Sequence, residues 1–330
     1  MRQKAYFYPP RPKNGYDNPY ALHFKVALAE RYEVAESDNR PVKGQLLSLL
    51  HHCFRSDVFL LNWIENVGVA RKRRLRTWIV LFCLNVVKWR HRQMVWVLHN
   101  IHPHEGENSS TEAIKRWLFR RADLIVTHSR AAEAYALPHA KCGVVFTHHP
   151  VTPIPIKEEF CLPSVPDVFI WGSILPYKGV GEFVAQPQLR SSGLSVKILG
   201  RCEDQRLAGE IERHCDGVVT FENRKAPFEE IAAYIRSSRY VLFPYIDSCF
   251  SSSGALIDTL VLGGIPVAPD TGCFKDLAEE GLCITYKSPD ELFTILQDKT
   301  RRIDAEKVQT FIDNNSWARF IEKIYKKLNE

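Results

Sequence analysis

The sequence predicts an α/β protein with two domains, each built around a parallel β-sheet. Its 330 residues favour two domains, because a domain usually has roughly 100–200 residues. Short β-branched or aromatic runs alternate with helical stretches along both halves, as in βαβ units. The halves also differ in charge: residues 1–150 hold 23 Lys and Arg against 12 Asp and Glu, and the rest hold 21 against 26.

Composition excludes several protein classes. Hydrophobic residues make up 45% and charged residues 25%, which is typical of a globular chain and not of a disordered one. The nine cysteines form no CxxC pair, so we expect reduced thiols and no disulfide scaffold or zinc ribbon. The start of the chain lacks the apolar core of a secretory signal. The longest stretch without Asp, Glu, Lys or Arg has 15 residues (142–156), too few for a membrane span. We therefore expect a cytoplasmic protein.

The expected elements of the first half are five strands and two helices. The strands are 4–10, 56–64, 94–100, 122–129 and 142–150, and the helices are 19–31 and 111–121, the latter with Ser109 and Ser110 as capping candidates. The stretch 150–166 holds five prolines and is the expected linker.

The second half contains six expected strands, at 166–173, 194–201, 216–222, 238–245, 263–270 and 281–286. Expected helices are 178–188, 205–214, 227–237 and 254–262. A last helix, 316–328, has one apolar face, which predicts that it docks onto another part of the protein. That face holds Trp317, Phe320, Ile321, Ile324 and Leu328.

Two segments of the second half predict a phosphate site. Residues 169–179 form a strand, a turn at Gly172 and Ser173, and then Lys178 near a helix start. Such a turn lets a ligand approach the backbone, and the helix N-terminus attracts anions. The alternative is an ordinary connection between a strand and a helix, with a surface lysine.

The second segment, residues 243–272, is more specific. Its serine-rich loop ends in Ser252, Ser253 and Gly254 and opens a short helix that carries Asp258 one turn later. Hydroxyls and amides at a helix start suit a diphosphate, and the carboxylate suits ribose hydroxyls. The alternative is that the serines cap a core helix.

These two segments, the final Ser-Trp helix and the His99-Asn100 pair resemble glycosyltransferases of the GT-B fold. The resemblance is to the group-1 (family 4-like) bacterial polysaccharide enzymes, and it covers nearly the whole chain. It implies two Rossmann-like domains that face a cleft. Residues 1–155 would bind the acceptor, 156–313 the nucleotide sugar, and the helix 314–330 would cross back to the first domain.

The resemblance also implies roles for single residues. The helix start at Ser253 and Gly254 would contact the diphosphate, and Gly172, Ser173 and Ser252 would also belong to the binding site of the nucleotide sugar. Lys178 would neutralise the leaving group, and Asp258 would bind ribose. Arg201 would lie near the nucleotide, 221–226 would flank the base, and His99 would face the donor. No cofactor or metal is implied beyond the nucleoside-diphosphate sugar, and the chain has no Asp-x-Asp motif.

Two departures from the family pattern favour inversion at the sugar carbon. Retaining members carry two glutamates eight positions apart, which correspond to Phe250 and Asp258 here, and Ser173 stands where they have an arginine. The serine loop is more similar to that of inverting β-mannosyltransferases, which favours GDP-mannose as the donor. A retaining transferase of the same fold is the alternative.

An inverting transfer needs a base for the acceptor hydroxyl, and residues 97–107 are rich in candidates. Glu105 is the first choice, His104 can act in its place, and Asp17 in the loop 14–18 is the second choice. Two other interpretations of residues 99–105 remain open: a metal site of a hydrolase, and a histidine-rich loop with no catalytic role.

Residues 71–92 contain eight Lys and Arg and no acidic residue, around an apolar centre (77–87) of 11 residues. Such a helix suits an anionic membrane surface, and therefore a lipid-linked saccharide acceptor. An internal helix with solvated ends is the alternative, and a nucleic-acid-binding half is a further one, although no known recognition motif is present. The leading interpretation is a transferase of exopolysaccharide, capsule or O-antigen synthesis at the cytoplasmic membrane face, with no nucleic-acid partner.

Overall fold

The structure is a computed structural model that describes residues 2–10, 18–35, 45–69, 72–101, 108–156, 160–246 and 252–330. The chain forms two compact units that divide between Pro150 and Val151, at the start of the proline-rich stretch. Unit 1 also contains the C-terminal residues Asn315–Glu330, whereas Ser253–Asn314 belong to unit 2. Each unit is built around one parallel sheet, which confirms the predicted fold class.

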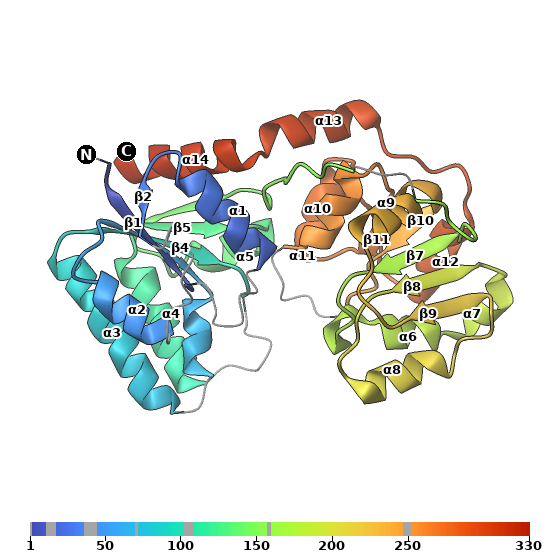
Figure 1. Ribbon diagram of the computed structural model, residues 1–330, viewed down its shortest axis with the longest axis horizontal. Coiled ribbons are helices and arrows are strands. Elements are labelled where there is room, and N and C mark those ends of the chain that lie inside the picture. The colour runs from blue at the N-terminus through green and yellow to red at the C-terminus, as the bar shows by residue number, and fades with distance from the viewer. Residues whose placement is uncertain are drawn as a thin grey trace. The chain divides into compact units, whose positions relative to one another are not determined.

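The sheet of unit 1 has the order β2-β1-β3-β4-β5-β6 (Figure 1). Its strands are β1 (Lys4–Tyr8), β2 (Glu33–Val34), β3 (Val58–Asn62), β4 (Gln93–Leu98), β5 (Leu124–Thr127) and β6 (Gly143–Phe146). Most of their side chains are buried because helices cover both faces, which explains their nearly continuous apolar sequences. Strand β2 was not predicted, since two residues are too short to show a pattern.

Helices cover the two faces of this sheet separately (Figure 1). On one face α1 (Pro19–Leu28) lies beside α14 (Trp317–Asn329), the predicted docking helix, whose Phe320 ring lies 5.1 Å from that of Phe24. On the other face lie α2 (Gln45–His52), α3 (Arg73–Trp89) and α4 (Ser109–Arg121). The short η1 (Ile64–Gly68) packs against α4, and α5 (Arg130–Ala136) packs on β5 and β6.

The start of α4 corrects one prediction. Neither Ser109 nor Ser110 caps this helix; its cap is Asn108, whose side chain accepts from the amides of Ser110 and Thr111. Asn108 has the extended backbone that an N-cap needs, whereas both serines already belong to the helix.

The sheet of unit 2 has the order β12-β11-β10-β7-β8-β9. Its strands are β7 (Val168–Trp171), β8 (Val196–Leu199), β9 (Val219–Glu222), β10 (Tyr240–Leu242), β11 (Pro266–Pro269) and β12 (Ile284–Tyr286). All six lie within predicted strands, because each apolar run is bounded by Gly, Pro or polar residues.

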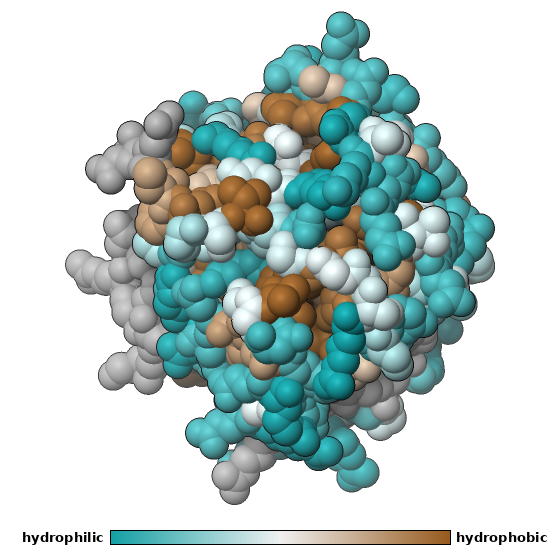
Figure 2. Space-filling model, turned by 90° about the vertical axis from the view of Figure 1, so that its right-hand side faces the viewer, coloured by the Kyte–Doolittle hydropathy of each residue, from teal (hydrophilic) through white to brown (hydrophobic). Residues whose placement is uncertain are grey.

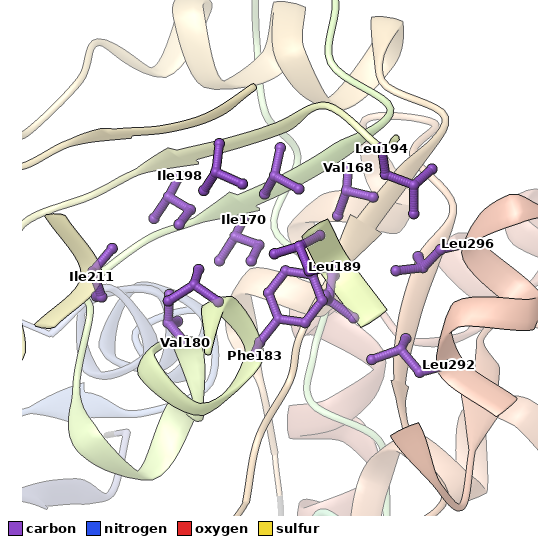
Figure 3. Close-up of a cluster of buried hydrophobic side chains, with 14 of the residues drawn as sticks. Val168, Ile170, Val180, Phe183, Leu189, Leu194, Ile198, Ile211, Leu292 and Leu296 are labelled. Carbon is purple, nitrogen blue, oxygen red and sulfur yellow. The ribbon is translucent and has the colours of Figure 1, made fainter. Parts of the chain in front are cut away.

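One face of this sheet and its helices enclose a core of aliphatic side chains (Figure 3). Val168, Ile170 and Ile198 project from the strands toward α6 (Val180–Val184), α7 (Pro187–Ser192), α8 (Gln205–Glu212) and α12 (Pro289–Gln297). Phe169 projects to the opposite face, where it stacks on Tyr234 of α9 (Phe228–Ser237). The remaining helices are α10 (Gly254–Val261), α11 (Gly272–Glu279) and α13 (Ala305–Asn314).

The predicted helix 178–188 is wrong. Lys178, the first residue of this segment, ends the 3₁₀ turn η2 (Pro176–Lys178). The helix α6 follows, and α7 begins at Pro187. Gly179 has a left-handed backbone (φ 65°), and Gln186 is extended because Pro187 follows it. These two residues divide the expected helix.

Within the described ranges, no helix is both long enough and apolar enough to cross a bilayer. All eight cysteines in these ranges are free. The face of the molecule in Figure 2 shows separate hydrophobic patches with hydrophilic residues around them.

Candidate active site

The candidate site lies where the strand order of unit 2 reverses. Strand β7 is the first strand of this sheet and β10 the fourth, and the two are neighbours. The connections after them therefore leave in opposite directions, and such a switch point is where open α/β sheets bind ligands. Both sequence segments that predicted a phosphate site follow these two strands.

Glycines let the backbone pack closely at this edge of the sheet. Gly172, directly after β7, has φ 98°, a conformation that favours glycine. A Cβ atom at Gly200, directly after β8, would lie only 1.8 Å from the Gly172 carbonyl oxygen. The Ile174 amide donates to the carbonyl of Arg201 (2.9 Å), so the two strand ends form one unit of backbone. Ser173 is exposed beside it.

The loop that carries Lys178 is held against the end of β10. A Cβ atom at Gly179 would lie 2.1 Å from the carbonyl oxygen of Pro244, so this position accepts only glycine. The Ile246 amide donates to the carbonyl of Tyr177 (3.1 Å). The structure thus explains why glycine follows Lys178: only glycine at position 179 allows the close contact with Pro244 that positions the lysine.

The ammonium group of Lys178 lies between the Gly172 turn and the ring of Tyr245. Its Nζ is 3.7 Å from the position that a Cβ atom of Gly172 would take, and 5.7 Å from the centroid of the Tyr245 ring. Burial lowers the pKa of Lys178 from 10.5 to about 8, because the charged form loses solvation. An anion beside the ammonium would restore that lost stabilisation.

The start of α10 offers amide donors. Ser253 is its N-cap, and its Oγ accepts from the Leu256 amide (3.4 Å). The Ser253 hydroxyl also acts on Tyr245, whose pKa it lowers against the larger rise caused by burial, so this hydroxyl is engaged within the protein. In the part of the chain that the structure describes, the amides of Gly254 and Ala255 have no acceptor. The backbone, more than the serine hydroxyl, is thus available to an anion.

Asp258 follows one turn later on α10. The side chain is half-buried, and none of the described residues pairs with its carboxylate. Burial raises its pKa from 3.8 to about 7. A ligand that donates hydroxyl hydrogen bonds would satisfy this carboxylate, whereas an anion would be repelled by its charged form.

Two aromatic residues that the sequence analysis did not single out connect these parts. Trp171, the last residue of β7, donates from Nε1 to Thr259 Oγ1 (3.1 Å) on α10. Tyr245 contacts Lys178 on its ring and Ser253 at its hydroxyl. The available signals were the Trp directly before the Gly172 turn and the Tyr three residues after β10, but neither has a motif of its own.

Other predicted nucleotide contacts are engaged elsewhere. The Arg201 guanidinium is exposed and pairs with Glu203 (3.3 Å). Within the expected base-flanking segment 221–226, the Arg224 guanidinium makes two hydrogen bonds to the carboxylate of Glu230. Ser252 is half-buried directly before the cap of α10.

In unit 1, His99 lies at the end of β4 and is buried, with 5% of its surface exposed. Its Nε2 lies 2.9 Å from Asn62 Oδ1, and its ring stacks on Trp63 with 4.1 Å between centroids. Burial and the neighbouring histidines hold its pKa well below the usual value. The ring of His99 also lies 5.6 Å from that of His128, another buried histidine, whose Nε2 lies 2.8 Å from the Tyr20 hydroxyl.

The predicted bases Glu105, His104 and Asp17 lie outside the described residues. Among the residues that are described, no group of three or more His, Cys, Asp or Glu side chains could hold a metal ion.

No protein-family model and no curated protein matches the sequence, but solved structures share its architecture. Anabaena Alr3699/HepE, solved in complex with UDP-glucose, is 13% identical, with a TM-score of 0.69 over 99% of this chain and 100% of its own. A UDP-forming trehalose-phosphate synthase from Burkholderia vietnamiensis is 10% identical, with a TM-score of 0.67 over 100% and 98%. AviGT4, a glycosyltransferase of avilamycin A biosynthesis, is 12% identical, with a TM-score of 0.62 over 99% and 97%.

The fold is GT-B. At 10–13% identity the likeness establishes the architecture alone. It confirms the expected GT-B fold, with two Rossmann-like domains in one chain. What this GT-B protein does must therefore be argued from its own site.

Proposed function

We propose that the protein is a glycosyltransferase that binds a nucleoside-diphosphate sugar at the switch point of unit 2. One observation carries the proposal: Tyr245 contacts the Lys178 side chain with its ring and Ser253 with its hydroxyl. Tyr245 therefore lies next to a cation and next to the N-terminus of α10. Among the described residues, two amides at that N-terminus have no acceptor. That combination suits a diphosphate.

The chemistry follows from the leaving group. When the bond between the sugar and the diphosphate breaks, negative charge develops on the departing oxygen. Lys178 and the amides of Gly254 and Ala255 are fixed donors, and fixed donors stabilise such charge without reorganising. We propose on this basis that the protein itself supplies the positive charge, without a metal.

Asp258 is proposed to bind the ribose hydroxyls. Its carboxylate has no partner within the described residues, and its place one turn after Gly254 fits a group attached to the diphosphate. Alr3699/HepE, which has the same architecture, was solved with UDP and with UDP-glucose, so a UDP-sugar is the first donor to test. GDP-mannose, which the serine loop favours, is the second.

Reaction class and acceptor are further parts of the proposal. We propose an inverting transfer to a lipid-linked saccharide in polysaccharide synthesis, with Glu105 as the base and His104 or Asp17 in its place. The departures from the two-glutamate pattern at Phe250 and Ser173 support inversion.

Exposed aromatic residues on α3 support the proposal of a lipid-linked acceptor. On α3 the side chains of Trp78, Phe82 and Trp89 are 76%, 51% and 79% exposed. These three residues are spaced four and seven positions apart, so they lie on one face of the helix. Lys72, Arg73 and Arg74 are exposed at the start of the same helix. Exposed tryptophans beside basic residues are typical of helices that bind anionic membranes at their surface. We call Trp78, Phe82 and Trp89 the α3 row.

The central test is nucleotide binding. Thermal stability of the purified protein is measured with UDP, GDP, ADP and dTDP, because a ligand that binds the folded state raises it. Lys178→Ala should weaken the affinity for the stabilising nucleotide by about 10- to 100-fold, as expected for a lost charge-assisted hydrogen bond.

The matched control is Lys275→Ala, which removes an exposed lysine of α11 in the same unit. Stabilisation by none of the four nucleotides, or equal binding by Lys178→Ala and the wild type, would contradict the proposal.

A further inference from the structure

Unit 1 contains a cavity of about 460 Å³ between α4 and α5, apart from the site just described. It is lined by Glu112, Lys115, Arg116, Phe119, Arg120, Tyr135, Pro138, His139 and Lys141. The volume lies in the usual range for pockets that take small molecules. All of these residues belong to unit 1 and are described.

The lining has an excess of positive charge. Its one acidic residue, Glu112, pairs with Arg116 (3.5 Å). In the described ranges of the chain, Arg120 and Lys141 have no acidic partner. The Lys141 amide donates to the carbonyl of Phe119 (2.8 Å), so the backbone of Lys141 is held beside the last turn of α4, next to Arg120. The side chains of Arg120 and Lys141, neither of which has an acidic partner in the described ranges, therefore start from neighbouring positions of the backbone.

Arginine at the end of a helix also complements the helix dipole, and Arg121 is exposed at the same end of α4. The dipole effect applies to Arg120 and Arg121 alike. Only Arg120 lines the cavity. A comparison of variants at Arg120 and Arg121 therefore distinguishes an effect on the cavity from an effect on the helix.

Three rings form one wall of the cavity. The centroid of His139 lies 5.5 Å from that of Phe119 and 5.4 Å from that of Tyr135, and the latter two are 6.0 Å apart. Lys115 is buried beneath them, where its Nζ donates to the carbonyl of Ile101 (2.6 Å) and lies 5.3 Å from the Tyr135 ring. Aromatic side chains that line a pocket supply apolar surface for the carbon skeleton of a ligand.

We propose that this cavity is a second binding site, for a phosphate ester carried on a sugar or a similar polyol. Arg120 and Lys141 bind the phosphate, and the ring wall packs on the carbon skeleton. The phosphate ester can belong to a free sugar phosphate or to the headgroup of an anionic lipid. The proposal does not depend on the nucleotide site.

The experiment measures binding of glucose 1-phosphate by isothermal titration calorimetry, with glucose as the uncharged control. Vesicles that contain phosphatidylglycerol form a separate arm, measured by co-sedimentation. The test variant is Arg120→Gln with Lys141→Gln, and the matched control is Arg121→Gln. Lys178→Ala weakens any binding of the ester at the proposed nucleotide site of unit 2, so the binding that remains in this variant is that of the cavity.

We expect glucose 1-phosphate to bind the wild type and Arg121→Gln equally, and the double variant about tenfold or more weaker. Vesicle binding that depends on the same two residues, without binding of the soluble ester, supports the lipid headgroup as the source. Absence of both, or an equal loss in Arg121→Gln, overturns the proposal. Because Lys141 lies in a connection between elements, Lys141→Gln alone repeats the test if the double variant does not fold.

Discussion

Lys178 and Asp258 are the ionisable side chains of the proposed nucleotide site. Burial shifts the pKa of each in the direction that favours its neutral form. The pKa of Lys178 falls to about 8, and that of Asp258 rises to about 7. Neither side chain has an oppositely charged partner among the described residues, and each is partly removed from water. This arrangement costs folding free energy that a bound nucleotide would recover. This is the residue-scale reason to expect a ligand here.

Nucleotide affinity should therefore fall as pH rises above about 8, because Lys178 loses its proton. A bound diphosphate favours the charged lysine, so the midpoint should lie somewhat above that value. The measurement is the dissociation constant of the stabilising nucleotide between about pH 7 and pH 10. Lys178→Arg keeps its charge throughout and should flatten the curve; an equally steep curve in this variant would exclude Lys178 as the titrating group.

Asp258→Asn should stabilise the free protein at alkaline pH. The folded-state pKa of this carboxyl is raised, so the unfolded chain ionises first, and the wild type loses stability as pH rises from about 3.8 to about 7. Asparagine does not ionise. The difference in melting temperature between the variant and the wild type should therefore be larger at pH 8 than at pH 4. A constant difference would mean that Asp258 is well solvated.

At the scale of elements, close contacts between connections position these side chains. The connection after β7 touches the start of the connection after β8 through Gly172 and Gly200, and the end of β10 through Gly179. Neither contact leaves room for a side chain. Strand order brings these connections together, and glycine allows them to touch.

Gly200→Ala should lower the free energy of unfolding by about 2 kcal/mol or more, because its Cβ meets backbone that cannot move away. It should also weaken nucleotide binding, since the Gly172 turn must shift. Gly209→Ala on α8 is the control: its Cβ would meet nothing within 4 Å, and we expect a gain of about 0.5–1 kcal/mol. Both values come from denaturant unfolding, and a tolerated Gly200→Ala would show that the two strand ends can separate.

The α3 row predicts membrane binding by one helix. Trp78→Ser with Phe82→Ser should lower the affinity for vesicles containing phosphatidylglycerol by about tenfold, and high salt should weaken the binding of the wild type. The control is Val26→Ser on α1, which removes a side chain that is 62% exposed on another helix. If the control lowers binding as much as the double variant, α3 is not the membrane contact.

At the scale of the whole molecule, we expect the two units to differ in their response to acid. Eleven of the twelve histidines are in the first 150 residues, and several are buried. Burial lowers the pKa of His128 to about 3 and that of His149 to about 4, whereas Glu65 has a raised pKa, about 7, and acts in the opposite direction.

Unit 1 should therefore lose stability as pH falls from about 6.5. The histidines of the unfolded chain bind protons at this pH, whereas the buried histidines of the folded chain stay neutral. Hydrogen exchange followed by mass spectrometry should show faster exchange in unit 1 at pH 5 after correction for the intrinsic rate, with unit 2 little changed. In His128→Gln the pH dependence should be smaller even though the variant is less stable at pH 7. Equal loss in both units would contradict this.

Much of the fold could be predicted because its signals are local. Each strand except β2 is an apolar run bounded by turn residues, and Gly172, Lys178 and Gly254 stand at positions where the resemblance places phosphate contacts. Short helices such as α5 and α7 were not predicted, because a helix of two turns has too few residues to show a periodic face. The engagement of Ser253 and Arg201 within the protein was also not predictable from motifs.

The amino-acid sequence by itself determined the α/β class, the two domains and the two segments of the proposed phosphate site. These follow from the order of apolar runs and turn residues, which are properties of neighbours in the chain. Only the tertiary structure decided that Tyr245 joins Lys178 to Ser253, that Trp171 holds α10, and that His99 is buried against Trp63. Each of these contacts joins residues from different elements, and no local pattern records which elements will meet.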